Sequence, residues 1–264
     1  MTPCQNTFLA FDTATESMSI AVSHAGRVHV HEAPGGALAS AALIPAILAL
    51  LAQAGVALQA LDAIAFGRGP GAFTGLRTAC SVAQGLAFGA AKPVLPIDTL
   101  LVVAEDARTR LESGARGHLE SDARTRLAAG RQTLRVWVAM DARMGEVYAA
   151  QYRFEPSGWQ VLDAPMLTTP HALNQRWQVD APEVVAGTAL GVFATQLLTG
   201  AALRVPDALP RASAMLPLAQ ALWHAGGAVD AALALPLYVR DKVAQTTAER
   251  DTARALKALA ESLR

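Results

Sequence analysis

Residues 66–77, FGRGPGAFTGLR, form the segment whose residue types best suit the binding of an anion. The apolar run at 61–66 before them predicts a short buried strand, so the glycines stand where a strand turns into a helix. A turn of this kind presents unpaired backbone amides, which suit a phosphate group or a second stretch of backbone. Gly69 and Gly71 are the candidate phosphate-binding positions, although their spacing is not that of a dinucleotide fingerprint.

Asp12 ends an apolar run near the N-terminus and is the second candidate for chemistry. A carboxylate there can orient a metal-bound water or nucleotide phosphates, with hydroxyl groups from Thr13 and Thr15 nearby. It can equally cap the turn before Glu16 by accepting backbone hydrogen bonds, and we favour this turn-capping role. Both interpretations stay open, and Asp12 and Thr13 join the two glycines as candidate cofactor-binding residues.

A nucleophile, a base or a metal in a recognisable arrangement is missing from the sequence. The six histidines are scattered; His29 and His31 share one face of a strand, but Glu32 points to the other face. No GxSxG, HExxH or Walker A pattern occurs. We expect no catalytic residue and no metal site. For Asp141, Arg143 and Glu146, an ion pair that stabilises a turn or bridges two lobes is favoured over catalysis.

The order of predicted elements indicates an α/β protein with two lobes. The first half reads as three strands, a helix, a strand, a helix and a strand, which is the ribonuclease-H-like layout of an antiparallel meander extended by parallel crossovers. A second meander begins near residue 134. The expected strands are 7–13, 18–22, 28–31, 61–66, 93–97, 135–139, 146–154 and 160–167, and the expected helices are 38–54 and 76–91, the second with Thr74 or Gly75 as its N-cap.

Both helices of the first half lack the charged stripe that a solvent-facing helix normally carries. No charged residue or histidine lies between Glu32 and Asp62, and none between Arg77 and Lys92. On a helical wheel, the first helix places its leucines and isoleucines on one arc and its alanines opposite. Covering by the second lobe is one explanation. We favour a protein interface in which the two helices meet a similar pair as a four-helix bundle. The expected contact residues are Leu38, Ala42, Pro45, Ala46, Ala49, Thr74, Arg77, Thr78, Ser81, Val82, Gly85 and Gly89.

Two segments stand apart from the lobes. The sequence DARTRL at 106–111 recurs at 122–127, which indicates a local duplication in a connector. Its mixed charges favour a solvated helix extension or a mobile loop over an RNA-contacting arm. The tail at 246–264 has a capping-box pattern at Glu249 and leucines at helical spacing, which predicts an amphipathic helix on its own lobe or on a partner.

Composition excludes several functional classes. The 264 residues are 52% hydrophobic, enough for a large core, and 22 basic residues balance 22 acidic ones. No overall positive field draws this chain to nucleic acid or to an anionic membrane, so direct tight binding to RNA or DNA is disfavoured. Residues 1–6 lack the basic region of a signal peptide, and no apolar run is long enough to cross a bilayer. Cys4 and Cys80 form no paired pattern, which favours a reduced, cytoplasmic protein.

Five motifs give the chain a close resemblance to the TsaB (YeaZ) family, the non-catalytic dimerisation subunits of the bacterial machinery that makes threonylcarbamoyladenosine in tRNA. They cover nearly the whole chain to about residue 243, and the second and fourth are highly specific. The motifs are FDTATE at 11–16, GRGPGAFTGLR at 67–77, AQGLA at 83–87, MDARMGEVY at 140–148 and PLYVR at 236–240.

The resemblance implies an actin-like, Hsp70-like (ASKHA) fold and a catalytic sister subunit, TsaD. That sister carries a His-x-x-x-His metal pair on its first long helix, whereas residues 38–49 here contain no His, Asp, Glu or Cys. The resemblance therefore implies a scaffold that is not itself an enzyme. It implies pairing with TsaD or with a second copy, docking of the ATPase subunit TsaE, contact with tRNA only through the complex, and ATP or ADP at the junction rather than an intrinsic cofactor. The alternatives are a small-molecule kinase or a peptidase-like hydrolase of the same superfold.

The expected domain organisation follows from these elements. A first lobe at 1–104 carries the dimerisation helices, and part of 214–245 packs back on it. The duplicated connector occupies 105–132 and is longer than the family resemblance leads us to expect. The second lobe spans 133–213, and the helical tail spans 246–264.

Overall fold

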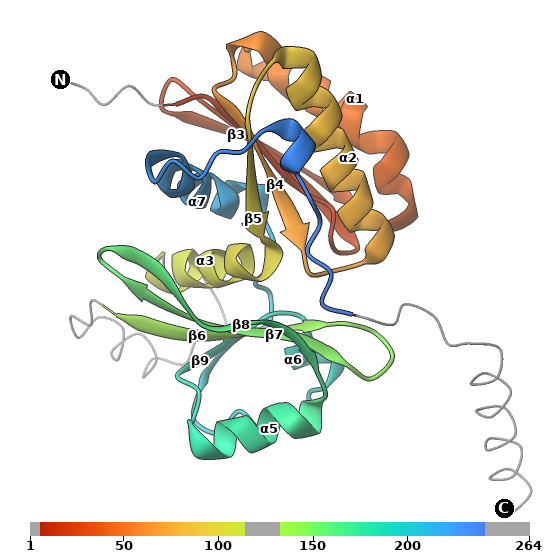
Figure 1. The fold of residues 1–264 in the computed structure, drawn as a ribbon. Helices are drawn as coiled ribbons and strands as arrows, with labels where there is room; N and C mark the ends of the chain where they lie inside the picture. Colours follow the sequence, from red (N-terminus) through yellow and green to blue (C-terminus); the bar gives the residue numbers. More distant parts are fainter. Residues whose placement is uncertain (1–5, 114–132, 241–264) are drawn as a thin grey trace, which may run out of the picture.

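The computed structural model describes residues 6–113 and 133–240, which form two lobes, each built on a five-stranded mixed sheet (Figure 1). In the first lobe an antiparallel meander leads into two parallel crossovers, and the strand order is β3-β2-β1-β4-β5. This confirms the predicted ribonuclease-H-like layout. The elements are β1 (Phe8–Asp12), β2 (Ser17–His24), β3 (Arg27–Pro34), η1 (Gly36–Leu38), α1 (Ala39–Ala54), η2 (Leu58–Ala60), β4 (Ala63–Gly69), α2 (Phe73–Ala90) and β5 (Val94–Asp98).

The second lobe repeats the same topology, with the order β8-β7-β6-β9-β10 matching that of the first sheet strand for strand. In both sheets the first strand pairs antiparallel with the second and parallel with a later one. The predicted two-lobed α/β architecture is therefore confirmed. The elements are β6 (Leu134–Asp141), β7 (Val147–Glu155), β8 (Gly158–Thr168), α5 (Pro170–Val179), β9 (Val184–Ala186), α6 (Ala189–Val192) and β10 (Leu203–Val205).

Alternation along the central strand explains why the first sheet is covered on both faces. All five residues of β1 are buried. Leu9 and Phe11 pack in one cluster with α1 and α2, whereas Phe8 and Ala10 pack in another with α7 (Ala212–His224). The chain thus returns from the second lobe to complete the first, and η3 (Ala231–Leu233) follows beside α2.

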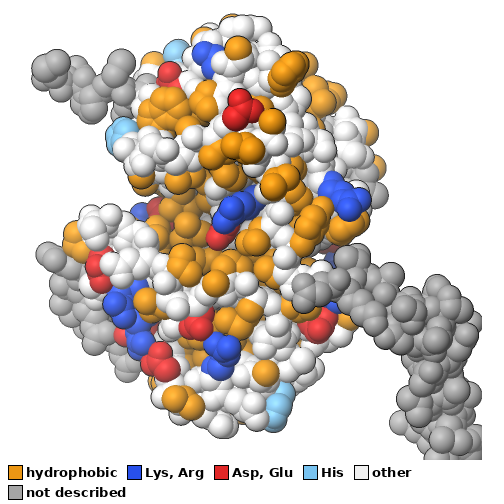
Figure 2. Space-filling model, in the orientation of Figure 1, with side chains coloured by type: hydrophobic (Ala, Val, Ile, Leu, Met, Phe, Trp, Pro, Cys, Tyr) orange, Lys and Arg blue, Asp and Glu red, His pale blue; other side chains and the backbone are white. Residues whose placement is uncertain are grey.

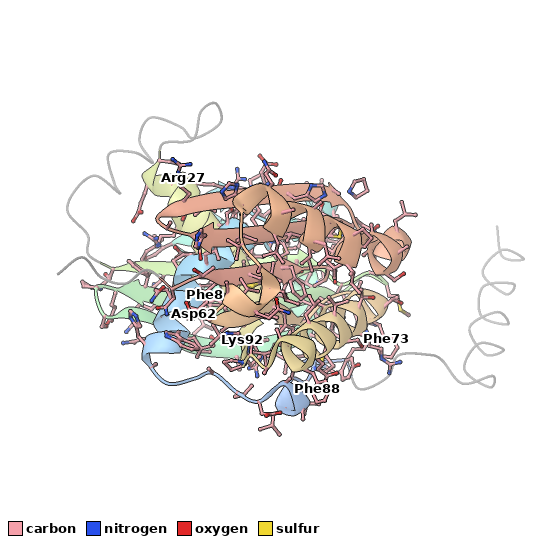
Figure 3. All side chains as sticks on the ribbon, turned by 90° about the horizontal axis from the view of Figure 1, so that it is seen from above. Phe8, Arg27, Asp62, Phe73, Phe88 and Lys92 are labelled. Carbon is pink, nitrogen blue, oxygen red and sulfur yellow. The ribbon has the colours of Figure 1, made fainter. Side chains whose placement is uncertain are left out.

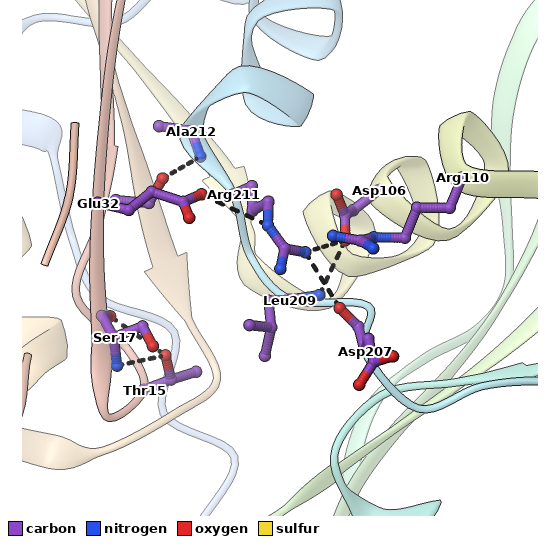
Figure 4. Close-up of polar contacts among 10 residues, drawn as sticks. Thr15, Ser17, Glu32, Asp106, Arg110, Asp207, Leu209, Arg211 and Ala212 are labelled. Atoms are coloured by element: carbon purple, nitrogen blue, oxygen red, sulfur yellow. Dashed lines mark hydrogen bonds and ion pairs between the residues drawn. The ribbon is translucent and has the colours of Figure 1, made fainter. Parts of the chain in front are cut away.

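The first copy of the repeat is not solvated, contrary to our expectation. It belongs to α3 (Thr99–Glu112), which lies between the lobes and packs against the second sheet (Figure 1). Asp106 is buried, and the hydrogen bonds that it accepts from Arg110, Arg211 and the Leu209 amide offset the cost of that burial (Figure 4). Arg211 also pairs with Glu32 of β3, so this cluster ties α3 to the first sheet. The second copy and the tail at 246–264 lie outside the described residues.

Two local expectations for the helices were wrong. α2 begins at Phe73 with Ala72 as its N-cap, not Thr74 or Gly75, because the Ala72 amide is held by the Ala14 carbonyl at 2.8 Å. On α1, Ile44 and Leu48 are exposed rather than grouped with the buried leucines.

Candidate functional site

α1 and α2 lie side by side on one face of the first sheet and leave an apolar surface uncovered by the described residues (Figures 1 and 3). Their inward sides fill the core, while Leu48 is 51% exposed and Phe88 is 86% exposed. Figure 2 shows hydrophobic side chains gathered on this lobe and along the groove below it. We call the exposed outer side of α1 and α2 the helix-pair surface. It comprises Leu38, Ile44, Pro45, Leu48, Ala49, Thr74, Arg77, Ser81, Gly85, Phe88 and Gly89.

The predicted contact residues divide into two groups. Eight are exposed on the helix-pair surface, namely Leu38, Pro45, Ala49, Thr74, Arg77, Ser81, Gly85 and Gly89. Ala42, Ala46, Thr78 and Val82 are half-buried, and all but Thr78 pack against the core cluster under α1 and α2. The alternative that the second lobe covers these helices is wrong for the described residues, because that lobe lies beyond the carboxyl ends of the strands (Figure 1).

Prediction missed Ile44, Leu48, Phe73 and Phe88, all of which are exposed. A helix without a polar stripe gives no sign of which apolar side chains face outward. The signal that was present is the absence of charge itself, which indicated that these two helices expose apolar side chains but not which side chains those are.

Residues 234–240, which we call the crossing segment, run from α2 to the second lobe. The Ala234 carbonyl accepts hydrogen bonds from Cys80 Sγ at 3.1 Å and Gln84 Nε2 at 2.9 Å. Further along, Arg240 donates to the Ala142 carbonyl at 2.8 Å and pairs with Glu146 at 2.7 Å. The crossing segment, which includes the PLYVR motif, therefore joins α2 to the second lobe.

Arg77 is held at the start of α2 by aromatic neighbours. Its Nε donates to the Tyr238 hydroxyl at 3.1 Å, and its Cζ lies 3.8 Å from the centre of the Phe73 ring. The Phe73 and Tyr238 rings are themselves in contact, with centroids 5.6 Å apart. The guanidinium is thus fixed in place while the side chain stays exposed.

Asp12 is used inside the first lobe. It is 1% exposed, and its carboxylate accepts hydrogen bonds from the Ala14 amide at 2.7 Å and the Thr99 hydroxyl at 2.8 Å. Burial raises the pKa of Asp12 to about 6, although both hydrogen bonds oppose the shift. A Cβ on Gly67 would lie 1.7 Å from Asp12 Oδ2, so only glycine leaves room for this carboxylate. The geometry supports the turn-capping interpretation.

The glycine-rich loop docks on backbone. A Cβ on Gly75 would lie 1.9 Å from the Thr13 carbonyl oxygen, and one on Gly71 would lie 2.6 Å from the Ala14 carbonyl oxygen. The Thr13 hydroxyl donates to the Gly75 carbonyl at 2.8 Å. The loop amides were expected to face either a phosphate or a second stretch of backbone. In the structure the loop packs against a second stretch of backbone, the turn after β1.

A cleft of about 500 Å³ lies between the lobes. Thr15, Glu16 and Gly71 line it from the first lobe, and Met140 and Arg143 are among the residues that line it from the second. Gly71 is the one candidate cofactor-binding residue on its walls; Asp12, Thr13 and Gly69 are buried behind them.

Ion pairs take up the charges around this cleft. Arg143 pairs with Glu16 across the lobes at 2.8 Å, and its backbone amide donates to Asp141 at 2.9 Å. Arg240 pairs with Glu146. The predicted turn-stabilising and lobe-bridging roles are confirmed, and both cleft arginines already have carboxylate partners.

Metal-ligating side chains do not gather in the part of the chain that is described. Over residues 6–113 and 133–240, no group of three or more His, Cys, Asp and Glu residues is placed to hold an ion. Within the same residues, no helix is both long and apolar enough to cross a membrane.

Comparison with known proteins decides the family. The TsaD family model, described as tRNA N6-adenosine threonylcarbamoyltransferase, matches residues 29–176. The Escherichia coli tRNA threonylcarbamoyladenosine biosynthesis protein TsaB is 34% identical over 240 residues, covering 89% of this chain and 95% of its own. The chain belongs to the TsaB family. The TsaB protein of Haemophilus influenzae is likewise 34% identical, over 90% of this chain and 94% of its own.

The solved structure of YeaZ from Pseudomonas aeruginosa supports the same family fold. It superimposes with a TM-score of 0.73 at 36% identity, and the match covers 89% of this chain and all of that one. Part of the present TsaB-family chain therefore has no counterpart in that structure. The tRNA N6-adenosine threonylcarbamoyltransferase of Nitrosospira multiformis is 35% identical over 108 residues, 38% of this chain and 30% of its own.

Proposed function

We propose that this chain is a non-catalytic scaffold subunit in the synthesis of tRNA N6-threonylcarbamoyladenosine, acting in the cytoplasm. It binds a TsaD-like catalytic subunit through the helix-pair surface and favours that subunit's active conformation. The single observation that carries the proposal is a pair of exposed helices that together contain only one charged residue, in a chain of the TsaB family.

Energetics support a partner at this surface. Burying a large apolar side chain contributes roughly 1.5 to 3 kcal/mol, so Leu48 and Phe88 together represent several kcal/mol of unused association energy. Gly85 and Gly89 leave open space beside α2, which lets another helix approach closely. The same surface pairs with a second copy when the catalytic subunit is absent.

Further partners belong to the proposal as well. A TsaE-like ATPase docks on the assembled pair, ATP or ADP binds at that junction, and tRNA is reached only through the complex. The buried carboxylate of Asp12 and the paired cleft arginines favour the junction over the cleft of this chain as the place for nucleotide.

A kinase or a peptidase-like hydrolase is the alternative, and the site geometry disfavours both. In an ASKHA-type kinase the carboxylate at the end of the first strand would face the phosphates. Here Asp12 faces Gly67 and Thr99 instead. A hydrolase needs a nucleophile beside a base. The thiol of Cys80 instead donates its hydrogen to a backbone carbonyl, that of Ala234, so it is not arranged as such a nucleophile.

Reconstitution tests the function. The purified chain is incubated with ATP, bicarbonate, threonine and tRNA, alone and then with the TsaD-like subunit, the TsaE-like ATPase and the adenylate-forming enzyme. We expect the modified base only in the complete mixture. Formation of the base by the isolated chain would overturn the scaffold proposal.

A matched pair of variants tests the surface. Gly85→Glu places a charge on the helix-pair surface, while Gly191→Glu places one at an equally open position on α6 of the second lobe. We expect Gly85→Glu to abolish both binding of the TsaD-like subunit and base formation, and Gly191→Glu to change neither. Ala46 is a poorer position for this test because it packs against the core.

A further inference from the structure

Arg77 is the one charged residue on the helix-pair surface. α1 contains no acidic or basic residue, and α2 contains no other. A single cation on an apolar surface is costly to bury unless something pairs with it. Its presence there therefore restricts which surfaces can cover α1 and α2.

The Arg77 guanidinium is arranged for recognition. Tyr238 holds Nε, and Phe73 stacks against the guanidinium plane, so the position of the fork is set before any partner arrives. Across residues 6–113 and 133–240, no carboxylate forms a salt bridge with it. Figure 3 shows Phe73 at the opposite end of α2 from Phe88, and the Phe73 and Tyr238 side chains also line the cleft between the lobes. An ordered arginine with free terminal donors is suited to bidentate binding of a carboxylate.

We propose that the helix-pair surface selects a partner that presents an Asp or Glu side chain to Arg77, and that this contact favours the catalytic partner over a second copy. The inference rests on the proposed function. Two copies that meet through the same surface can offer each other only the residues of that surface. Since neither α1 nor α2 supplies a carboxylate, a copy offers Arg77 no partner from this surface. A partner with apolar helices and one suitably placed acid satisfies both requirements.

RNA is the competing ligand for an exposed arginine, and the surroundings disfavour it. Binding of a phosphate backbone takes several cations spaced along a surface. On the helix-pair surface the neighbours of Arg77 are apolar or uncharged, such as Thr74 and Ser81. A carboxylate on a protein partner matches this isolated charge better.

Substitution of Arg77 tests the inference. Arg77→Met keeps a long apolar side chain and removes the charge, and Arg77→Lys keeps the charge and removes the fork. We expect Arg77→Met to weaken binding of the TsaD-like subunit about tenfold or more, as for a lost charged hydrogen bond, and to strengthen self-association measured by sedimentation. Arg77→Lys should weaken partner binding by a smaller factor. Thermal melting confirms that each variant folds.

The controls separate this inference from the proposed function. Arg27→Met, at an exposed arginine on β3, should leave both associations unchanged (Figure 3). If Gly85→Glu blocks partner binding while Arg77→Met does not weaken it, the surface stands and the carboxylate contact is overturned. If Gly85→Glu leaves partner binding intact, the proposed function itself fails. Loss of tRNA binding with unchanged partner binding in Arg77→Met would also overturn the inference in favour of RNA.

Discussion

At the scale of single residues, the position of the Asp12 carboxylate depends on Gly67, because any side chain there would occupy the same space. Asp12 was recognisable from sequence as an aspartate at a strand end, but its direction was not, because that depends on Thr99 and Gly67. Thr99 lies on α3 and Gly67 on β4, both distant from Asp12 in the sequence. The carboxylate is buried and hydrogen-bonded within its own lobe. Its ionisation should therefore change the free energy of unfolding in a pH-dependent way.

The first prediction concerns that pH signature. The pKa of Asp12 is raised from 3.8 to about 6 by burial, so the unfolded chain releases this proton before the folded chain does as pH rises. The contribution of Asp12 to stability is therefore fully present below pH 4 and is lost as pH rises through 6. Asp12→Asn cannot ionise, so its free energy of unfolding relative to the wild type should rise by about 3 kcal/mol between pH 3.5 and pH 7. Urea unfolding at a series of pH values measures this, and a difference independent of pH would contradict it.

The second prediction compares two glycines of α2. Gly75→Ala forces a Cβ to within 1.9 Å of a backbone oxygen that cannot move freely, so we expect a loss of about 3 kcal/mol or more in the free energy of unfolding. Gly85→Ala meets open space and gains helix propensity, so it should stabilise the fold by up to about 1 kcal/mol. Equal effects of the two changes in urea unfolding would show that the loop does not pack as described.

At the scale of elements, α1 and α2 were identified from sequence and their orientation was not. β1 and β4 were predictable because each is a short apolar run that is almost completely buried. The helices carry apolar residues on nearly every side, and periodicity cannot then separate the core face from the exposed face. Ile44 and Leu48 are the consequence, since their types match those of the buried Leu43 and Ile47.

The third prediction uses that ambiguity at two adjacent positions of α1. Leu48→Ser alters an exposed side chain, so the free energy of unfolding should change by less than about 0.5 kcal/mol while self-association weakens. Ile47→Ser alters a fully buried side chain and should cost about 4 kcal/mol. Urea unfolding and sedimentation of both variants check this. Unchanged self-association in Leu48→Ser would argue against the helix-pair surface as the site of dimerisation.

At the scale of the whole molecule, the duplicated architecture was predictable because both halves begin with a meander. The crossing segment was not, since residues 234–240 have no regular structure and their contacts with α2 span 150 residues or more of sequence. Separation in sequence also hid the role of Arg211, which joins Asp106 of α3 to Glu32 of β3. Sequence patterns indicate the periodicity of single helices and strands. They could not predict these two sets of contacts, because both depend on how the lobes pack against each other.

The fourth prediction concerns the contacts between the lobes. Arg240 is largely buried and reaches both Glu146 and the Ala142 carbonyl, so Arg240→Ala should lower the free energy of unfolding by about 1.5 to 3 kcal/mol. Arg143 and Glu16 are both mostly exposed, so Arg143→Ala should change it by less than about 1 kcal/mol. Denaturant unfolding of the two variants, with Glu146→Ala to close a double-mutant cycle, measures the difference. An equal loss at both positions would contradict a larger contribution to stability from the contacts of Arg240 than from those of Arg143.

The return of the chain to its starting lobe imposes an order on biosynthesis. One side of the first sheet is sealed by α7, whose residues leave the ribosome only after all of the second lobe has been translated. During that interval Phe8 and Ala10 lack the α7 part of their cover, although Val102 of α3 is already present. Nascent chains of this protein therefore carry an incomplete first-lobe core until α7 emerges, and exposed apolar surface of this kind is what makes partly folded chains prone to aggregation.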